Sequence, residues 1–388
     1  MAKILLAFFA GTDYGTKDSA IGPFYESFIT ALQARGHKLM VMAHPNFGAA
    51  EWGRYDASLA REIKNFNPDL CIIFNNSFWD ISDLVNCPIL IYASDSVLYF
   101  ANQRRIKNNP ARYLFIVDKS SKKVLVENFG VKEEQISLSI PFSGVKPQEM
   151  PLEQNIVFIG SKFISQPVTP INFFLNEKPS DSQRKEFMQA LNYLKKNPFA
   201  DLATFINEKI VTSELVFKYF NTGYLIKQLS DEKRIAVLSA ISDLGLTLYG
   251  TPNWTEFQLY NFTLSLSYSA KRVKTLAENA AAYNSSKIGI SAGHLQAVDG
   301  FPWRTLDIMQ SNACLVSDYH KDFDKLFPKD LFPIYKDAYE AREICKELLG
   351  NEKKRKKIVK RCQEYAFKNF GFEKIAKNIN ALIGDSIV

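Results

Sequence analysis

Two carboxylates that flank an arginine form the most informative cluster of side chains in this 388-residue sequence. They lie in segment 299–309 (DGFPWRTLDIM), which runs directly into an apolar strand. If a helix starts near Phe301, the free amides of its first turn point back toward Asp299, and such a helix end binds anions. Arg304 would add a charge-assisted contact to a phosphate, and Asp307 would accept the two hydroxyls of a ribose. The segment therefore predicts a site for a diphosphate joined to a ribose; the alternative is a loop-capped helix with ordinary surface acids.

Further candidates follow predicted strands, where doubly wound domains present their ligand contacts. A lysine directly after a Gly-Ser strand end would stabilise phosphate charge, unless it is a solvated surface lysine. In a Tyr-Gly pair, the tyrosine ring would stack on a nucleotide base and the glycine would let the backbone approach it closely. Alternatively, the pair simply ends its strand. A histidine after another strand would donate to the diphosphate, although a lone histidine is more often structural. These candidates are Gly160, Ser161, Lys162, Tyr249, Gly250 and His294.

The N-terminal half offers residues for the second reactant. A glycine-containing loop at 11–22 follows the first apolar strand, and Gly11, Asp13 and Tyr14 would face an acceptor. The loop has neither the G-x-G-x-x-G nor the G-x-x-x-x-G-K-[ST] spacing, so nicotinamide and ATP sites are not indicated. Asp95 follows another apolar strand and is the candidate acceptor-side base, with a helix cap or a turn aspartate as the alternative.

The elements that must position these residues alternate between strand and helix. Apolar runs of strand length separated by helical repeats predict parallel sheets that are covered on both faces. A linker at 144–154 divides the chain, a mainly helical insertion covers 164–240, and 338–383 is helical. Strands are expected at 3–10, 37–43, 70–74, 89–93, 113–117 and 136–140, and after the linker at 155–159, 246–249, 287–290, 314–317 and 332–335.

Segment 299–309 resembles the signature of the group 1 glycosyltransferases of the GT-B superfamily, which is E-G-F-G, four residues and then E-A-M-A before a buried strand. Both glutamates are aspartates here, and Pro302 replaces the second glycine. The resemblance implies that Asp299 contacts a donor sugar and that Asp307 holds the ribose. It implies that the amides at Gly300 and Phe301 bind the nucleotide diphosphate. The matching residues are Asp299, Gly300, Phe301, Asp307 and Met309.

Three features are similar to a divergent branch, the spore-maturation-type (CgeB-like) glycosyltransferases: Arg304, segment 155–161 (NIVFIGS) and segment 244–254 (LGLTLYGTPNW). We expect transfer of a sugar from a nucleotide-sugar to a hydroxyl of a glycan or lipid-linked acceptor, without a bound metal. The resemblance implies that this transfer retains the anomeric configuration. If Asp95 is a general base, inversion follows instead. A D-x-D at 322–324, the metal motif of the other glycosyltransferase fold, is expected to be a solvated turn.

The expected architecture is therefore α/β, with two Rossmann-like domains that face a cleft. We expect an acceptor-side domain at 1–145 and a donor-side domain, with the helical insertion, at 146–365. A C-terminal helix at 366–388 is expected to pack back toward the first domain. A sugar-nucleotide epimerase of similar fold is the second enzyme hypothesis, but it needs cleft histidines and the chain has only four. A noncatalytic protein that binds nucleotide-sugars or glycans is the hypothesis from another class.

Composition and charge set the remaining expectations. Five scattered cysteines without metal-ligand spacing favour a reducing, cytoplasmic setting and no bound metal. No apolar stretch approaches the roughly 20 residues of a membrane span, and no zinc knuckle, RNP-like strand or basic-aromatic stripe indicates nucleic acid. Most of the net charge of +7 comes from segment 351–361, which has seven basic residues and one acid. That segment is either a solvated helix or a contact with anionic lipid on the inner face of a membrane. Its basic residues are Lys353, Lys354, Arg355, Lys356, Lys357, Lys360 and Arg361.

Overall fold

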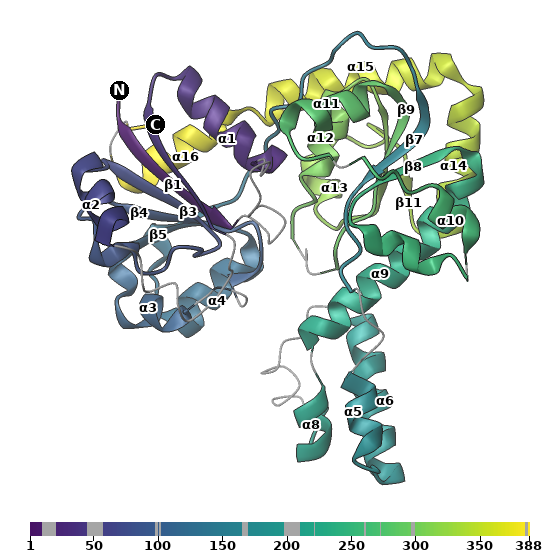
Figure 1. Ribbon diagram of the computed structural model, residues 1–388, viewed down its shortest axis with the longest axis horizontal. Coiled ribbons are helices and arrows are strands. Elements are labelled where there is room, and N and C mark those ends of the chain that lie inside the picture. The colour runs from purple at the N-terminus through teal and green to yellow at the C-terminus, as the bar shows by residue number, and fades with distance from the viewer. Residues whose placement is uncertain are drawn as a thin grey trace.

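The computed structural model describes residues 1–9, 21–44, 57–97, 100, 102–164, 170–197, 210–220, 222–259, 261–271, 273–295, 299–384 and 387–388. The predicted acceptor residues Gly11, Asp13 and Tyr14 lie outside these ranges. In the described part, the chain forms two α/β domains with a helical arm and a C-terminal run of helices, as the sequence predicts (Figure 1).

The first domain is built on a six-stranded parallel sheet in the order β2-β1-β3-β4-β5-β6. β3 and β4 are buried along their whole length, as expected for strands covered on both faces. β6 is shorter than predicted, and Pro141, which has no N–H to donate, lies just beyond it. The strands are β1 (Lys3–Phe9), β2 (Lys38–His44), β3 (Leu70–Phe74), β4 (Ile89–Tyr92), β5 (Tyr113–Val117) and β6 (Ile136–Leu138), and the helices are α1 (Pro23–Ala34), α2 (Ala57–Phe66), α3 (Gln103–Asn108) and α4 (Lys119–Phe129).

The second domain repeats this plan in a five-stranded parallel sheet, ordered β11-β10-β9-β7-β8. Counted within each domain, the first five strands follow the same order, 2-1-3-4-5. The strand order reverses between β7 and β9, and ligands of open α/β sheets bind beyond the carboxyl ends of the strands at such a point. The strands are β7 (Gln154–Ile159), β8 (Leu246–Tyr249), β9 (Ser286–Ser291), β10 (Cys314–Asp318) and β11 (Ile334–Tyr335), and the helices are α9 (Thr222–Ile241), α10 (Phe262–Leu266), α11 (Leu276–Asn284), α12 (Arg304–Gln310) and α13 (Phe323–Leu326).

The helical insertion forms an arm that projects from the second domain (Figure 1). It contains α5 (Pro170–Asn176), α6 (Asp181–Lys196) and α8 (Glu214–Tyr219), and α9 leads from the arm back to the domain. The arm has a small core of its own, which includes Phe174, Phe187 and Leu194. The described part of the insertion therefore folds largely on itself, and α9 carries its residues to the core of the second domain.

The C-terminal segment is three helices, α14 (Ala338–Gly350), α15 (Glu352–Asn369) and α16 (Phe372–Ile383). α14 and α15 cover the second domain, whereas α16 lies beside the sheet of the first domain (Figure 1). Ile375 and Ile379 of α16 are buried in the same core as Phe28 and Leu6. Both ends of the chain therefore lie at the first domain, and the domains are joined twice.

Contacts between α1, α11 and the loop before α12 hold the two domains together beside these connections. The Glu26 carboxylate accepts a hydrogen bond of 2.5 Å from the Leu276 amide at the start of α11. The Trp303 ring stacks on Phe24 and meets Tyr92 edge-on. These contacts fix how the carboxyl edges of the two sheets face each other. Among the described helices, none is long and apolar enough to cross a membrane.

Candidate active site

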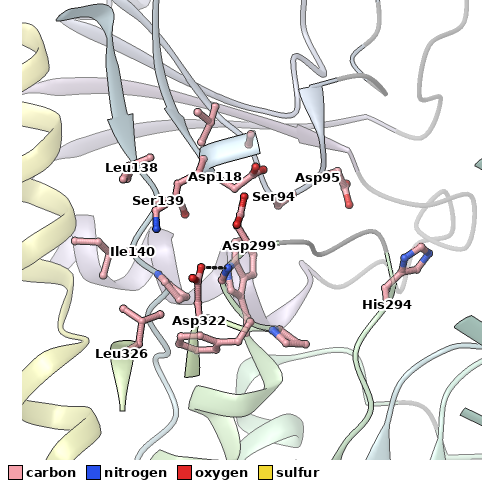
Figure 2. Close-up of a pocket in the computed structure, with 18 of the residues that line it drawn as sticks. Ser94, Asp95, Asp118, Leu138, Ser139, Ile140, His294, Asp299, Asp322 and Leu326 are labelled. Atoms are coloured by element: carbon pink, nitrogen blue, oxygen red, sulfur yellow. Dashed lines mark hydrogen bonds between the residues drawn. The ribbon is translucent and has the colours of Figure 1, made fainter. Parts of the chain in front are cut away.

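A cleft of about 560 Å³ lies between the two domains. Its walls are the loops that follow β4, β5 and β6 in the first domain and the loops that follow β9 and β10 in the second. Figure 2 shows Ser94, Asp95 and Asp118 reaching it from one side and His294 and Asp299 from the other. The cleft thus joins the carboxyl edges of both sheets, which is where their topology places a ligand.

The segment that leads into α12 is arranged differently from the prediction. α12 begins at Arg304, three residues later than expected, because the Phe301 ring is buried against Phe323, Phe327 and Phe370. Gly300 adopts a φ of 75°, which favours glycine. Its amide donates a 2.7 Å hydrogen bond to the Asp322 carboxylate. The Gly300 amide is therefore already occupied.

Arg304 lies where the sequence predicts a phosphate contact. Its side chain lines the cleft, and its Nε donates a 2.6 Å hydrogen bond to the Ile159 carbonyl at the end of β7. Its guanidinium lies 4.7 Å from the centre of the Phe158 ring. The strand end and the aromatic face together hold the cation at the point where the strand order reverses.

A second arginine, Arg234 of α9, was not predicted and lies beside Arg304. Its Nε donates 3.1 Å to the Ala292 carbonyl, and its Nη1 donates 2.7 Å to the Ser161 carbonyl. The guanidinium also lies over the Phe163 ring at 4.2 Å. Burial, together with the charge of Arg304, lowers the pKa of Arg234 to about 9. The sequence could not reveal it, because Arg234 sits in a charged run (DEKR) that is typical of an exposed helix face.

A buried network behind Arg234 holds the loop after β9. The Asp318 carboxylate accepts a 2.9 Å hydrogen bond from the Gly293 amide, contacts His320 at 3.2 Å and pairs with Lys233. Burial alone would raise the pKa of Asp318, but the His320 hydrogen bond and the Lys233 charge hold it below its usual value. A side chain at Gly293 would collide with His320, since an added Cβ would lie 2.6 Å from its ring. The network thereby fixes the backbone next to His294.

His294 lines the cleft, as predicted for a ligand contact, and its ring meets Phe163 edge-on at 4.3 Å. Burial and the charges of Arg234, Lys227 and Lys233 lower its pKa to about 3. The imidazole is therefore neutral near neutral pH, and it can offer a ligand one N–H rather than a positive charge.

Asp299 lines the cleft too, but its carboxylate crosses to the first domain. Oδ2 accepts hydrogen bonds from the Ser120 amide at 3.0 Å and from the Ser120 hydroxyl at 2.6 Å. Ser120 lies in the first turn of α4, where Asp118 caps the helix. The residue expected to contact a donor sugar is, in this conformation, a bridge between the domains.

Asp95 stands at the cleft on a rigid turn. The Asn75 side chain, at the end of β3, accepts from the amides of Ser94 and Asp95 at 2.7 and 3.0 Å and donates 2.8 Å to the Asp95 carboxylate. Asn75 has a φ of 53°, a conformation that asparagine tolerates better than most residues. Asn75, which the sequence analysis missed, thus positions the candidate base.

Two predicted contact residues are bonded within the protein and are absent from the cleft lining. The Asp307 carboxylate accepts from the Ser143 hydroxyl at 2.6 Å and from the Asn279 amide at 3.0 Å, and burial raises its pKa. It therefore ties α12 to the segment that follows β6 and to α11 in this conformation. Lys162 forms an ion pair of 2.6 Å with Glu256. Neither charge faces the cleft that Arg304 and Arg234 line.

The predicted glycine contacts serve packing between strand ends. A Cβ at Gly250 would lie 2.3 Å from the Gly160 carbonyl oxygen, and a Cβ at Gly160 would lie 2.6 Å from the Arg304 guanidinium. Any larger residue at either position would therefore collide with neighbouring atoms of the protein. The Tyr249 hydroxyl bonds Gln154 at 2.8 Å. Ser161 contributes its carbonyl to Arg234, so the strand end does support the cleft, although through a different atom than expected.

The D-x-D does not form a solvated turn throughout. Asp322 is buried and lines the cleft, where it holds the Gly300 amide, so the prediction was wrong for this residue. Asp324 accepts a 2.7 Å hydrogen bond from the Tyr319 hydroxyl. The two carboxylates thus have separate partners. Among the described residues, no group of three His, Cys, Asp or Glu side chains has the arrangement of a metal site.

The basic segment at the start of α15 is only partly available to a surface. Arg355 is buried and donates to the Leu348 and Leu349 carbonyls, which removes it from any lipid contact. Arg361 donates to the Asp330 and Leu331 carbonyls. Lysines 354 and 356 pair with glutamates 347 and 352, whereas lysines 353, 357 and 360 are exposed.

Comparison with known proteins agrees with this geometry. The family described as "Glycosyl transferase-like" matches residues 227–381, and no curated protein matches the chain in sequence. Sucrose-phosphate synthase from Thermosynechococcus elongatus has a similar structure, with 11% identity, 98% of both chains covered and a TM-score of 0.54. HepE from Anabaena, solved with UDP and glucose, has 14% identity, covers 99% of this chain and 100% of its own, and gives a TM-score of 0.53. An alpha-glucosyltransferase solved with UDP-glucose and DNA containing an abasic site gives 11% identity, 99% and 100% coverage, and a TM-score of 0.51.

Two Rossmann-like domains that face a shared cleft, with a C-terminal helix returning to the first, define the GT-B fold, and the similar structures confirm it. In fold the chain is similar to GT-B glycosyltransferases, and its residues 227–381 match the family described as "Glycosyl transferase-like". Its assignment to the spore-maturation-type branch stays a prediction.

Proposed function

We propose that the chain transfers a sugar from a nucleotide-sugar donor to a hydroxyl acceptor, and that Arg234 and Arg304 bind the donor diphosphate. The pair of guanidinium groups at the end of β7 is the observation that carries this proposal. Both donate to backbone carbonyls, and no carboxylate of the described residues lies within ion-pair distance of either. Two cations of like charge side by side, one of them buried, are unfavourable unless an anion joins them, and a diphosphate is such an anion.

The same two cations suit the chemistry of the donor. As the glycosidic bond breaks, negative charge develops on the leaving diphosphate, and preorganised cations stabilise that charge. The neutral His294 would add one hydrogen bond. We propose that transfer needs no divalent metal, since two arginines already supply the positive charge, and that EDTA leaves the rate unchanged.

For the acceptor we propose a hydroxyl of a glycan or of a lipid-linked glycan, bound beside Asp95 on the first-domain side of the cleft. We further propose retention of anomeric configuration, as the family resemblance implies. Proton NMR of the product would report the anomeric configuration directly. An inverted product would instead favour Asp95 as a general base, and Asp95→Asn should then abolish transfer.

The proposal is tested by calorimetry and thermal shift with UDP-, GDP-, ADP- and CMP-sugars. A nucleotide-sugar that binds to the wild type and not to Arg304→Ala supports the assignment. Binding that is equal in the two proteins contradicts the donor site. Hydrolysis or transfer assays with the same donor then separate an enzyme from a noncatalytic binding protein.

We propose a weak contact with anionic lipid on the cytoplasmic face of a membrane, made through the exposed lysines 353, 357 and 360. This contact would bring the cleft close to a lipid-linked or envelope glycan acceptor. Flotation with vesicles containing anionic phospholipid would test it. Replacing these three lysines by alanine should reduce binding, whereas replacing lysines 178, 195 and 196 of the arm is the control. Equal binding of both variants would contradict the proposal.

A further inference from the structure

Two cysteine thiols are in contact at the amino ends of β3 and β4 in the first domain, outside the lining of the cleft. The Sγ atoms of Cys71, in β3, and Cys87, just before β4, are 3.5 Å apart. All five cysteines of the chain are free thiols in this structure. Cys71, Cys314, Cys345 and Cys362 are buried, and Cys87 is partly exposed. The Cys71–Cys87 pair therefore combines a thiol contact with access from solvent on one side.

The backbone on both sides of the pair is fixed. The Cys71 amide donates a 3.0 Å hydrogen bond to the Pro88 carbonyl, next to Cys87. The Arg112 guanidinium donates to the Cys87 and Val85 carbonyls, each at 2.7 Å. Since the segments are already held together, closing the remaining gap between the sulfurs to about 2 Å requires only side-chain movement.

The pKa values of the two thiols are shifted in opposite directions, which favours thiol–disulfide exchange that begins at Cys87. A hydrogen bond from Cys71 and the charge of Arg112 lower the pKa of Cys87, although burial opposes them. The hydrogen bond to Cys87, followed by burial, raises the pKa of Cys71. The accessible Cys87 sulfur is thus the better nucleophile, and the buried Cys71 sulfur is placed to attack it next.

We propose that Cys71 and Cys87 form a reversible disulfide with a low-molecular-weight disulfide as the oxidant. The Cys87 thiolate attacks one sulfur of the oxidant, which forms a mixed disulfide and releases one thiolate. Cys71 gives its proton to that thiolate and attacks the Cys87 sulfur, which forms the Cys71–Cys87 bond and releases the second thiolate. The two protein thiols are oxidised, and the oxidant is reduced to two thiols.

The bridge closes the loop 72–86, which contains several unfavourable features. Asn75 and Asn76 have φ values of 53° and 55°, and the buried Ser77 hydroxyl and Asp80 carboxylate have no hydrogen-bond partner. This loop also carries the Asn75 side chain that holds Asp95. The disulfide is therefore expected to raise the melting temperature by several degrees and to slow amide exchange within 72–86.

The test treats the full-length protein with oxidised glutathione. No Lys or Arg lies between residues 65 and 103, so one tryptic peptide carries both cysteines and loses two hydrogens when the bridge forms. We expect this mass change in wild type, its reversal by dithiothreitol and a higher melting temperature before reversal. Cys71→Ala should instead accumulate a glutathione adduct on Cys87, and Cys314→Ala is the control that keeps the bridge.

Three results would overturn the proposal. One is an unmodified peptide after prolonged oxidation of the folded protein. Another is a stable glutathione adduct on Cys87 in wild type, which would show that Cys71 cannot reach it. The third is a disulfide between two copies of the chain on a nonreducing gel, with no internal bridge. If Cys71→Ala fails to fold, Cys87→Ser, at the partly exposed position, should lose both the two-hydrogen mass change and the gain in melting temperature.

Discussion

Replacing Arg234 by methionine separates a ligand-binding role from a structural one. The guanidinium is buried in a setting that lowers its pKa to about 9, so the charged form is disfavoured there. A hydrogen bond from a charged group is worth about 1.5–3 kcal/mol. If the diphosphate binds at Arg234, its loss should weaken binding by about 10- to 150-fold, since 1.4 kcal/mol is a factor of ten.

The stability of the same variant should change little. Methionine fills a similar volume and removes a buried charge, which is a gain. The loss is two hydrogen bonds from the guanidinium, to the carbonyls of Ser161 and Ala292, at about 1.5–3 kcal/mol each. The two effects are opposite in sign, so the melting temperature is expected to stay within a few degrees of wild type.

Calorimetry with the tightest-binding nucleoside diphosphate and a thermal melt of each protein measure the two quantities. Arg342→Met is the matched control, because Arg342 also donates to a backbone carbonyl, that of Ala240 in α9, but lies outside the cleft lining and pairs with Asp243. Its nucleotide affinity should equal that of wild type. The reasoning is refuted if Arg234→Met binds the nucleotide as tightly as wild type, or if both variants lose affinity alike.

Three further predictions concern buried or bridging carboxylates. Burial raises the pKa of Asp80 to about 6. The carboxyl therefore binds a proton more tightly in the folded protein than in the unfolded chain. As the pH rises from about 4 to about 6, the protein loses the part of its folding free energy that depends on the protonated form. Asp80→Asn should therefore raise the free energy of unfolding by about 2–3 kcal/mol at pH 8 and hardly at pH 4, and parallel melting curves at both pH values would contradict this. Asp307→Ala, which leaves Ser143 without its acceptor, should lower the melting temperature as well as activity; lost activity in a fully stable protein would instead support direct contact with the ribose. Asp299→Ala removes the bridge to Ser120, and small-angle scattering of the ligand-free protein should then give a larger radius of gyration than wild type. An unchanged radius would mean that the other interdomain contacts suffice.

The architecture followed from the sequence because buried parallel strands leave a strong local pattern. β3, β5 and β8 have the predicted bounds, since each is a short, mainly apolar run with clear ends. β11 is only two residues long, because Pro333 cannot donate to a sheet ladder. Local sequence therefore predicted the order of elements better than their ends.

The cleft was predicted only in part. Asp95, His294, Asp299 and Arg304 line it, because residues after parallel strands necessarily gather at one edge of a sheet. Whether a side chain there is open to a ligand depends on its neighbours in space. Asp307 has the right spacing in the sequence, yet its carboxylate is hydrogen-bonded to Ser143, 164 positions away.

What the sequence by itself determined is the alternation of strand and helix, hence two doubly wound domains and the edge at which a ligand binds. What only the tertiary structure decided is which charges remain for that ligand. The Arg234 side chain lines the cleft, although its charged sequence context predicts an exposed helix face. The Lys162 side chain instead forms an ion pair with Glu256. The physical reason is that strand periodicity is a local property of the chain. The pairing of buried charges depends on contacts between residues far apart in sequence, which no local pattern records.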